Sequence, residues 1–538
     1  ALASLLEVLR KPHDIRAGQH LTSVTHASGQ RFVQAGFALA TLPYEAFYSL
    51  DAILRTLWRL LITQQRLLEW NPSGDQERLS RTDFLAALRA MWFAPVLAIC
   101  AVIWLALSSP AVLPVAGLFL VLWLGSPAIA WWISLPMVNR EPSLTAQQTR
   151  FLRKIARKTW AFFDTFVGPQ DHWLPPDNYQ ESRDELLAHR TSPTNIGMAL
   201  LANLSAHDFG YIPTGELVER TTQTLDTMAE LERYRGHFYN WYDTQSLRPL
   251  HPTYVSTVDS GNLAGHLLTL RAGLLALIDS PILEPRWLEG LSDTLEILLD
   301  EVGEVAPATL TEFCAVIDAA RETGPTMLAA TQLLLDNLVR LAEATVAELG
   351  GEARGKSAWW AQALATQCRA FNDDLGFLTP WSVLTASLDG DDDRTELSVM
   401  PTLRTLAGLE ETQAAAVACQ YGVTPEQEVW LQPLDPHVAQ GSERARLRIA
   451  AIQRLALQTG EFANMEYGFL YDKESRLLSI GYSVEERRRD PSCYDLLASE
   501  ARLSVFVGIA QGQLPQESWF ALGPLLTNPG GDPILLSW

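Results

Sequence analysis

Two long apolar stretches near the N-terminus predict membrane-spanning helices. Residues 92–107 and 110–138 contain no charged side chain, and a Ser-Ser-Pro break marks their boundary. A helix needs about 20 apolar residues to cross a hydrocarbon core of about 30 Å, so the second stretch is long enough and the first is slightly short. Because a soluble hairpin would seldom lack charge from Met91 to Asn139, we predict a transmembrane helical hairpin over residues 91–138.

The first 90 residues, 1–90, carry weaker membrane signals. Residues 32–50 are mostly apolar but contain Pro43 and Glu45, which fits an interfacial segment or a helix packed within a bundle. Residues 51–69 combine leucines and arginines in an amphipathic pattern that is typical of a helix lying on a membrane surface. Arginines and lysines flank the hairpin on both sides. A hairpin returns the chain to its starting side, so both flanks are predicted to be cytoplasmic.

From Leu144 onward, apolar positions recur at the 3.6-residue period of an α-helix. Helix start signals stand at Thr214, at the Asp259-Ser260 pair and at Ser492. The expected helices cover residues 144–167, 193–206, 214–233, 260–279, 285–301, 325–349, 354–372, 395–419, 440–465 and 492–511.

One β-hairpin is predicted among these helices, with strands over residues 467–472 and 477–482. The sequence shows no repeat of fixed period. Many helices joined by long polar loops predict a mainly α fold over residues 144–538, and the architecture that this pattern favours is an α/α toroid, which is a ring of helical hairpins.

Composition and charge exclude several classes of function. The 538-residue chain carries a formal net charge of −21, and phosphate binding needs a basic surface, so no nucleic-acid partner is expected. The five cysteines are widely spaced without a Cys-x-x-Cys pair, so the sequence predicts neither disulfides nor a metal site, which fits a reducing compartment. Phosphate-binding and dinucleotide-binding fingerprints are absent from the sequence, and no cofactor is expected for this portion.

Five polar segments between the predicted helices are candidates for ligand contact. In residues 171–180 a Pro-Pro pair fixes an extended backbone, and the pattern alone favours a rigid connection between helices. The segment can instead present four side chains to a ligand: Trp173, Asp177, Asn178 and Tyr179. In residues 190–197, Arg190 and Asn195 can donate hydrogen bonds to sugar hydroxyls, and a helix cap is an equally good interpretation.

The third segment, residues 236–244, favours binding over a structural role. Four aromatic residues lie beside polar ones, and flat rings with polar neighbours suit the apolar face and the hydroxyls of a sugar. Its candidate side chains are Tyr239, Asn240, Trp241 and Asp243. In the fourth segment, residues 254–266, small residues surround Asp259 and Asn262 at a helix start, although Asp259 can simply cap that helix.

The fifth segment, residues 490–502, contains Asp495 and Glu500. On a helix these two carboxylates, five residues apart, do not share a face well. Glu500 stands in the apolar sequence Leu-Leu-Ala-Ser-Glu-Ala-Arg-Leu, and a carboxyl among apolar side chains has a raised pKa that suits glycosidic chemistry. Spacing alone favours a buried glutamate with a structural partner.

The same segments closely resemble cyclic β-1,2-glucan synthases, and the resemblance covers nearly the whole chain. Two small departures are Glu466-Tyr467, where Asp-Phe is expected, and Cys493, where an aromatic residue is more usual. The matching stretches are residues 173–180, 190–197, 236–244, 254–266, 469–472, 479–482 and 494–502, together with 42–46 and 67–70 in the membrane region.

The resemblance implies a very large, multi-pass protein of the bacterial inner membrane, with the soluble domain in the cytoplasm. In that family a glucosyltransferase domain that uses UDP-glucose and Mg²⁺ precedes the membrane helices. A cyclisation domain and a phosphorylase-like domain follow them. This chain, which begins without Met, is expected to be a piece that lacks both outer domains. Residues 144–538 are expected to form a glycoside-hydrolase-like (α/α)6-barrel that is incomplete at its C-terminal end.

The activity implied by the resemblance is retaining intramolecular transglycosylation, which cyclises a linear β-1,2-glucan chain. Retention needs two carboxylates about 5–5.5 Å apart. Glu500 matches one family position, and its partner glutamate is expected beyond residue 538, so this piece alone is expected to be inactive. Two rival hypotheses remain: an endo-β-1,2-glucanase that uses water as the acceptor, and a non-catalytic module that holds glucan for neighbouring domains.

Overall fold

The structure, a computed structural model, describes residues 17–65, 84–135, 144–180, 187–303, 306–324, 328–350, 355–382, 400–409, 435–527 and 534–537. Backbone contacts divide the chain into two compact units. The first contains residues 1–143 and 526–534, and the second contains residues 144–525 and 535–538. The second unit begins at Leu144, where the helical periodicity of the sequence also begins.

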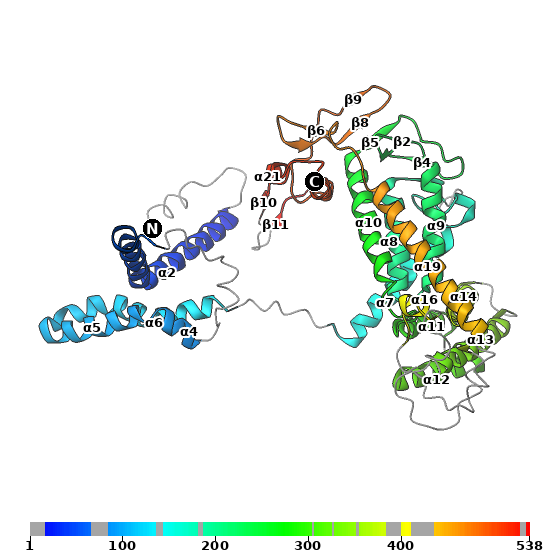
Figure 1. Ribbon diagram of the computed structural model, residues 1–538, viewed down its shortest axis with the longest axis horizontal. Helices are drawn as coiled ribbons and strands as arrows, with labels where there is room; N and C mark the ends of the chain where they lie inside the picture. The colour runs from blue at the N-terminus through cyan, green and yellow to red at the C-terminus, as the bar shows by residue number, and fades with distance from the viewer. Residues whose placement is uncertain are drawn as a thin grey trace. The chain divides into compact units, whose positions relative to one another are not determined.

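The described residues of the first unit are helical (Figure 1). Its elements are α2 (Ala17–Trp58), the π-helix η1 (Arg59–Thr63), α4 (Phe84–Ala90), α5 (Phe93–Ser108), the 3-10 turn η2 (Pro110–Val112) and α6 (Leu113–Ile133). Helices α5 and α6 lie side by side as a hairpin, and α2 contacts both. The ring of Phe47 on α2 stacks on that of Phe93 on α5, with centroids 4.5 Å apart.

One continuous helical run in the described residues is long and apolar enough to cross a membrane. It covers Pro110–Ile133, 24 residues with a mean hydropathy of 2.0. A second crossing would require α4 and α5 to act as one broken span, and these two helices are bent by 66° relative to each other. The predicted hairpin is therefore supported firmly in its second helix only. The predicted weak span over residues 32–50 lies inside the 42-residue helix α2.

The predicted amphipathic helix over residues 51–69 is not a separate element. Helix α2 continues without a break to Trp58, and η1 follows it directly. Tyr48, Leu50 and Leu54 are all exposed in this part of the chain. The last residues of the predicted helix, 66–69, lie outside the described part of the chain.

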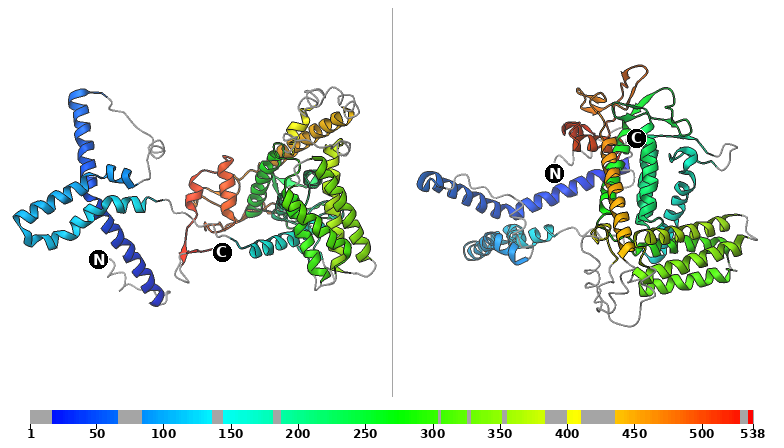
Figure 2. Two further views of the ribbon diagram at one scale, coloured as in Figure 1. Left: turned by 90° about the horizontal axis from the view of Figure 1, so that it is seen from below. Right: turned by 45° about the vertical axis from the view of Figure 1, so that its right-hand side comes forward.

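The second unit is mainly helical. Its helices are α7 (Ala146–Phe166), α8 (Pro193–Asp208), α9 (Thr214–Glu230), α10 (Thr257–Ala276), α11 (Arg286–Val302), α12 (Ala308–Thr323), α13 (Leu328–Gly350), α14 (Lys356–Leu378), α16 (Leu403–Ala407), α19 (Asp435–Phe462), α20 (Ala501–Ala510) and α21 (Glu517–Ala521), with the short turn η3 at Pro169–Asp171. Helix α10 packs against α8, α19 and α20, and Leu263, Leu267 and Leu274 on it are fully buried. Helices α12, α13 and α14 lie side by side, and α14 also packs on α11 (Figure 2).

Short antiparallel strands tie the loops of this unit together. Strand β5 (Tyr254–Ser256) leads into α10 and pairs with β8 (Gly481–Ser483), which also pairs with β9 (Arg488–Arg489). The predicted hairpin is confirmed as β6 (Tyr471–Asp472) and β7 (Leu477–Leu478), with Tyr471 opposite Leu478. The other strands of this unit are β1 (Arg190–Thr191) paired with β4 (Tyr242–Asp243), and β2 (Arg233–Tyr234) paired with β3 (His237–Phe238). Strands β10 (Leu526–Thr527) and β11 (Ile534–Leu535) form a further two-stranded ladder near the C-terminus.

Several predicted helix boundaries were wrong for identifiable reasons. Helix α10 begins earlier than the Asp259-Ser260 signal, because Ser256 provides the cap by accepting a hydrogen bond from the Asp259 backbone N–H at 3.3 Å. The predicted start of α9 at Thr214 is confirmed, and the Pro213 side chain before it makes no cap bond. The predicted helix over residues 492–511 is a helix only from Ala501. The backbone of residues 492–494 hydrogen-bonds instead to Leu478 and Ile480, at the end of β7 and just before β8.

Two further differences concern whole elements. Helix α12 was not predicted at all, although its apolar positions Leu310, Phe313 and Ile317 are buried at helical spacing. Of the helix predicted over residues 395–419, the described residues contain the short helix α16, and the rest of that prediction lies outside the described part of the chain.

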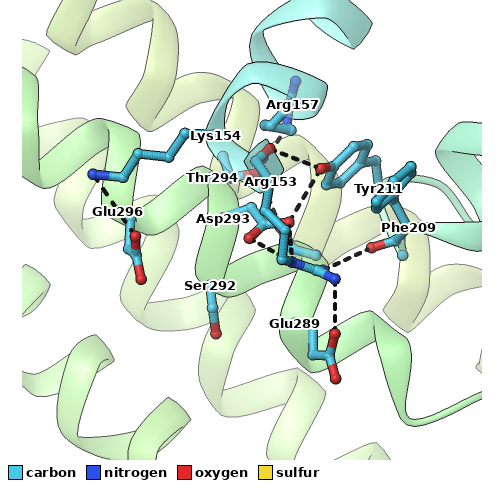
Figure 3. A network of polar contacts seen from close by, with 12 residues as sticks. Arg153, Lys154, Arg157, Phe209, Tyr211, Glu289, Ser292, Asp293, Thr294 and Glu296 are labelled. Carbon is cyan, nitrogen blue, oxygen red and sulfur yellow. Dashed lines mark hydrogen bonds and ion pairs between the residues drawn. The ribbon is translucent and has the colours of Figure 1, made fainter. Parts of the chain in front are cut away.

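A polar network joins α7 to α11 at the start of the second unit (Figure 3). Arg153 Nε donates to both carboxylate oxygens of Asp293 at 2.9 and 3.0 Å, and Arg153 Nη1 lies 2.8 Å from Glu289. The Tyr211 hydroxyl also donates to Asp293, at 3.1 Å. Because Asp293 is buried and has these partners, the network fixes the orientation of the first helix on the body of the unit.

Candidate functional site

The side chains singled out in the sequence gather mainly where helices α8 and α10 begin. Ser192 caps α8 by accepting a hydrogen bond from the Asn195 backbone N–H at 3.2 Å. The segment 190–197 therefore does contain a helix cap, which was one of its two interpretations, and the capping residue is Ser192. Ser256 caps α10 in the same way. Two adjacent helix starts, each preceded by a short strand, therefore hold the loops with their polar side chains close together.

Asp177 is the centre of the first group of contacts. Its Oδ2 accepts from Arg190 Nε and Nη2 at 3.1 and 2.9 Å and from Asn178 Nδ2 at 2.9 Å. Its Oδ1 accepts from Asn195 Nδ2 at 3.4 Å. The carboxylate thus fixes three predicted binding residues, because a charged acceptor with several donors restricts their rotamers.

A second group of contacts extends from Arg190 to α10. The Arg190 guanidinium lies over the Trp241 ring, 5.0 Å from its centroid. Trp241 Nε1 donates to the amide oxygen of Asn240 at 3.2 Å, and Asn240 Nδ2 donates to Asp259 Oδ2 at 3.1 Å. Asp259 Oδ1 accepts from the Thr194 hydroxyl at 2.7 Å. Asp259 is therefore a bridge between three segments. The alternative interpretation of Asp259 as the cap of α10 was wrong, because Ser256 holds that position.

The network reaches Glu500 through Asn262. Asn262 Nδ2 lies 3.2 Å from Thr194 Oγ1 and 3.5 Å from Glu500 Oε2. Asp259 and Asn262 are three residues apart on α10, so they lie on the same face of the helix. Glu500 immediately precedes α20, and α20 packs closely on α10 where Gly261 faces Ser504. A Cβ at position 261 would overlap Ser504, so glycine is what permits this approach.

Glu500 lines an open cavity of about 650 Å³. Its polar wall includes Asn262, Glu500 and Arg502, and its apolar wall includes Phe506 and Trp519. Glu500 itself is exposed, so the apolar enclosure expected from its neighbours in sequence is not formed. The physical reason is local: Glu500 stands at the turn before α20, and the apolar side chains around it in sequence point elsewhere, Leu496 and Ala501 being buried.

The pKa values of two tyrosines near this site are raised, and nearby carboxylates contribute to the rise. Burial raises the pKa of Tyr494, and the nearby carboxylates of Asp259 and Glu500 raise it further. Burial also raises the pKa of Tyr254 to about 12, with Asp490 contributing to the rise. Both phenols therefore stay protonated at neutral pH and can act as hydrogen-bond donors to a ligand.

Other predicted binding residues serve the fold instead. Trp173 has a left-handed backbone (φ 61°) and covers Arg220, whose guanidinium lies 5.7 Å from its ring centroid. Tyr239 is buried, and its hydroxyl points to Glu232 at 3.4 Å. Asp243 accepts from the Ser246 backbone N–H at 2.7 Å, and this bond is the main reason why its pKa is lowered. It therefore stabilises the turn after β4.

Two predicted residues lie at the margin of the site. The Tyr179 ring packs on Phe166, with centroids 5.0 Å apart, and the side chain is 39% exposed. Asp495 is exposed, and its backbone oxygen accepts from Gly523. The sequence analysis missed Thr194, Phe506 and Trp519. Thr194 lies in the candidate segment 190–197 but resembles a residue at a helix start. Phe506 and Trp519 follow the candidate segment 490–502 in an apolar pattern that also fits core packing.

The cavity is lined by groups that can donate hydrogen bonds and by groups that can accept them. Amide, guanidinium and carboxylate groups stand near aromatic rings, which is the usual composition of a small-molecule site. In the described part of the chain, no three His, Cys, Asp or Glu side chains cluster closely enough to hold a metal ion. The site thus belongs to a helical domain with an open cavity, which is lined by one carboxylate, polar side chains and two aromatic side chains.

The sequence of the chain is similar to that of one particular known protein. Over its whole length, the chain is 33% identical to part of the cyclic beta-(1,2)-glucan synthase NdvB of Rhizobium meliloti (strain 1021), across 546 aligned residues. The resemblance expected from the sequence motifs is thereby confirmed. The chain spans 17% of the length of that relative.

Two other comparisons add little. No family model matches the chain. Among solved structures, a putative glucoamylase from Bacteroides fragilis NCTC 9343 is similar over 29% of this chain and 38% of its own, with 16% sequence identity and a TM-score of 0.22. A similarity of this size does not determine how the helices are arranged.

Proposed function

We propose that residues 144–538 form the glucan-cyclising part of a cyclic β-1,2-glucan synthase, built on an (α/α)6-type helical domain. The observation that carries the proposal is the position of Glu500. It lines the large cavity, and its neighbour Asn262 connects it to a continuous polar and aromatic tract that ends at Trp241 and Arg190. The 33% identity to a cyclic β-1,2-glucan synthase supplies the substrate class.

In this proposal Glu500 is one of the two carboxylates of a retaining transglycosylation. One carboxylate forms a glycosyl-enzyme and the other donates and then accepts the proton. The second carboxylate is proposed to come from sequence beyond residue 538. The acceptor is the 2-hydroxyl at the non-reducing end of the same glucan chain, so the product is a ring. Cyclisation requires that water be kept from the glycosyl-enzyme, and bound sugar rings against Phe506 and Trp519 would do this.

The neighbouring polar residues position the substrate. Asn262 and Thr194 share a hydrogen bond at 3.2 Å, which leaves the second Asn262 N–H directed at Glu500 or at a sugar hydroxyl between them. Arg190 is held by Asp177 and covers one part of the Trp241 ring, so its remaining N–H groups can donate to hydroxyls. No cofactor is needed for this step, whereas UDP-glucose and Mg²⁺ would serve a glucosyltransferase domain elsewhere in the longer polypeptide.

A test of this proposal must distinguish ring formation from hydrolysis and from glucan binding without turnover. The protein, together with the sequence proposed to supply the second carboxylate, is incubated with linear β-1,2-glucan, and the products are digested with an exo-acting β-glucosidase. Rings resist digestion and lack the mass of one water. Glu500→Gln should abolish them, whereas Glu322→Gln, a change at an exposed glutamate near the end of α12, should not. Shorter linear products alone would establish a glucanase, and binding without turnover would establish a glucan-holding module.

We further propose that the first unit anchors this domain in the bacterial inner membrane, with the soluble domain in the cytoplasm. The apolar run Pro110–Ile133 supports one crossing, and a multi-pass arrangement would require the bent pair α4 and α5 to cross as well. Resistance of the protein to extraction by alkaline carbonate tests the anchor. Thiol labelling at exposed Cys100 on α5, from each side of sealed vesicles, tests the second crossing.

A further inference from the structure

A second cavity of the same unit lies away from Glu500 and has an unusual lining. It measures about 230 Å³, and it is formed by α7, the residues just before α9, the start of α9 and the start of α14. None of its lining residues lines the Glu500 cavity. Three aromatic side chains contribute to it: Trp160, Tyr211 and Trp359. Trp359 is 38% exposed, so the wall of the cavity includes a partly exposed indole ring.

Arg157 lines this cavity and carries an unused donor. Its side chain is only 2% exposed, its Nε donates to Thr294 Oγ1 at 2.8 Å, and its guanidinium lies 5.4 Å from the Tyr211 centroid (Figure 3). Its Nη1 has no acceptor among the residues that the structure describes. Burial lowers the pKa of Arg157, which marks it as poorly solvated. A buried donor of this kind is normally satisfied, so the structure calls for an acceptor from outside the fold.

Two carboxylates line the same cavity. Asp164 and Glu216 each place an oxygen 3.9 Å from Arg220 Nη1. Burial raises the pKa of Glu216 to about 7, with Arg220 opposing the rise. At neutral pH this carboxyl is therefore present in both forms, so it can donate a hydrogen bond or accept one.

The combined lining selects the charge of the ligand. An anion would meet Asp164 and Glu216, and a cation would meet the guanidinium group of Arg157. A neutral molecule with several hydroxyl groups satisfies both the unused donor and the carboxylate acceptors, and its apolar face can stack on Trp359. The volume is below the roughly 300–1,000 Å³ typical of pockets for drug-sized ligands, which suits one sugar ring and not a long oligosaccharide.

We propose that the cavity around Arg157 is a second carbohydrate site, which holds a single neutral hexose unit apart from the Glu500 cavity. That the hexose is a glucosyl unit of the β-1,2-glucan chain rests on the proposed function. A second point of attachment would retain the growing chain on the domain while its ends are brought to Glu500.

Site-directed thiol labelling tests this site independently of catalysis. Gln362 is exposed on α14 and lines the cavity, so Gln362→Cys is labelled with a maleimide in a background without other exposed cysteines. At a sugar concentration about ten times its Kd, linear β-1,2-glucooligosaccharide should slow labelling about tenfold by mass action. Glu219→Cys, on an exposed face of α9 that does not line the cavity, should be labelled at the same rate with and without sugar.

Three outcomes separate the possibilities. Protection that persists in Glu500→Gln and is lost in Trp359→Ala supports the second site even if the cyclisation proposal fails. Protection by glucose and other neutral hexoses, without preference for β-1,2-linked chains, supports the site and removes its link to the glucan. No protection by any sugar, or protection by choline at equal concentration, overturns the proposal. Unchanged thermal unfolding of Trp359→Phe, with protection retained, shows that stacking and not folding is measured.

Discussion

The close contact between α10 and α20 gives the sharpest test of how Glu500 is positioned. In Gly261→Ala the added methyl group would overlap both the side chain and the Cα atom of Ser504, so a rotamer change cannot relieve it and the helices must separate. Overpacking of this kind costs typically 1–3 kcal/mol of unfolding free energy. Alanine recovers up to about 1 kcal/mol through its helix propensity. We therefore expect a small net loss of stability.

The effect on activity should be much larger than the effect on stability. Glu500 immediately precedes α20, so a separation of the two helices moves its carboxylate directly. A displacement of about 1 Å at a reacting group can cost on the order of 10²-fold in rate. We expect ring formation to fall by about that factor while the protein remains folded at the assay temperature. The assay is the mass-resolved yield of exo-glucosidase-resistant product from the protein together with the sequence proposed to supply the second carboxylate.

Gly376→Ala is the matched control for this prediction. Gly376 lies inside α14, and a Cβ there would meet no atom within 4 Å. It should raise the unfolding free energy by about 1 kcal/mol through helix propensity and leave ring formation unchanged. If Gly261→Ala were as active as Gly376→Ala, the packing of α20 on α10 would not be what positions Glu500, and the reasoning would fail.

Three further predictions test other parts of the second unit. Trp241→Ala should raise the ratio of linear to cyclic products if the ring that lies under Arg190 also helps, as the proposed function implies, to keep water from the glycosyl-enzyme; an unchanged ratio would remove Trp241 from that role. Asn262→Ala should lower ring formation more than Thr194→Val does, because only Asn262 reaches Glu500; equal losses measured side by side would contradict this order. Glu216 should make the wild type less stable as the pH rises from about 4.5 to about 7. In this range the folded Glu216 carboxyl, with a pKa of about 7, still binds a proton that the unfolded chain has lost. Glu216→Gln should flatten this part of the thermal-unfolding profile, and an unaltered slope would show that Glu216 is not the titrating group.

Local pattern was enough to predict those parts of the fold whose cause is local. Apolar residues at helical spacing gave helices such as α8 and α11 within a few residues, and the turn between residues 472 and 477 gave the β6–β7 hairpin. The prediction failed where a distant partner decides. Residues 492–494 do not join α20, because the backbone of this segment hydrogen-bonds to the strand region near Leu478 and Ile480 instead.

The candidate site was predictable in its members but not in their roles. Asp177, Arg190, Asn195 and Asp259 were named from polar loops, and the structure brings them into one network. Which residue each of them contacts depends on partners that lie 13 to 65 positions away in the sequence, and no local pattern contains this information. Trp173 illustrates the limit. Its setting in a polar loop resembled a sugar platform, yet its ring covers the buried guanidinium of Arg220.

Helix α10 explains why a site exists at this place in the fold. Its strand β5 pairs with β8, and its cap Ser256 leaves Asp259 free to bridge Thr194 and Asn240. One turn later, Asn262 faces Glu500 from the same side of the helix. Gly261, on the adjacent face, lets α20 approach closely enough for that contact. Binding tract and candidate catalytic carboxylate are thus set by four consecutive positions of one helix, so a change in its register should impair both together.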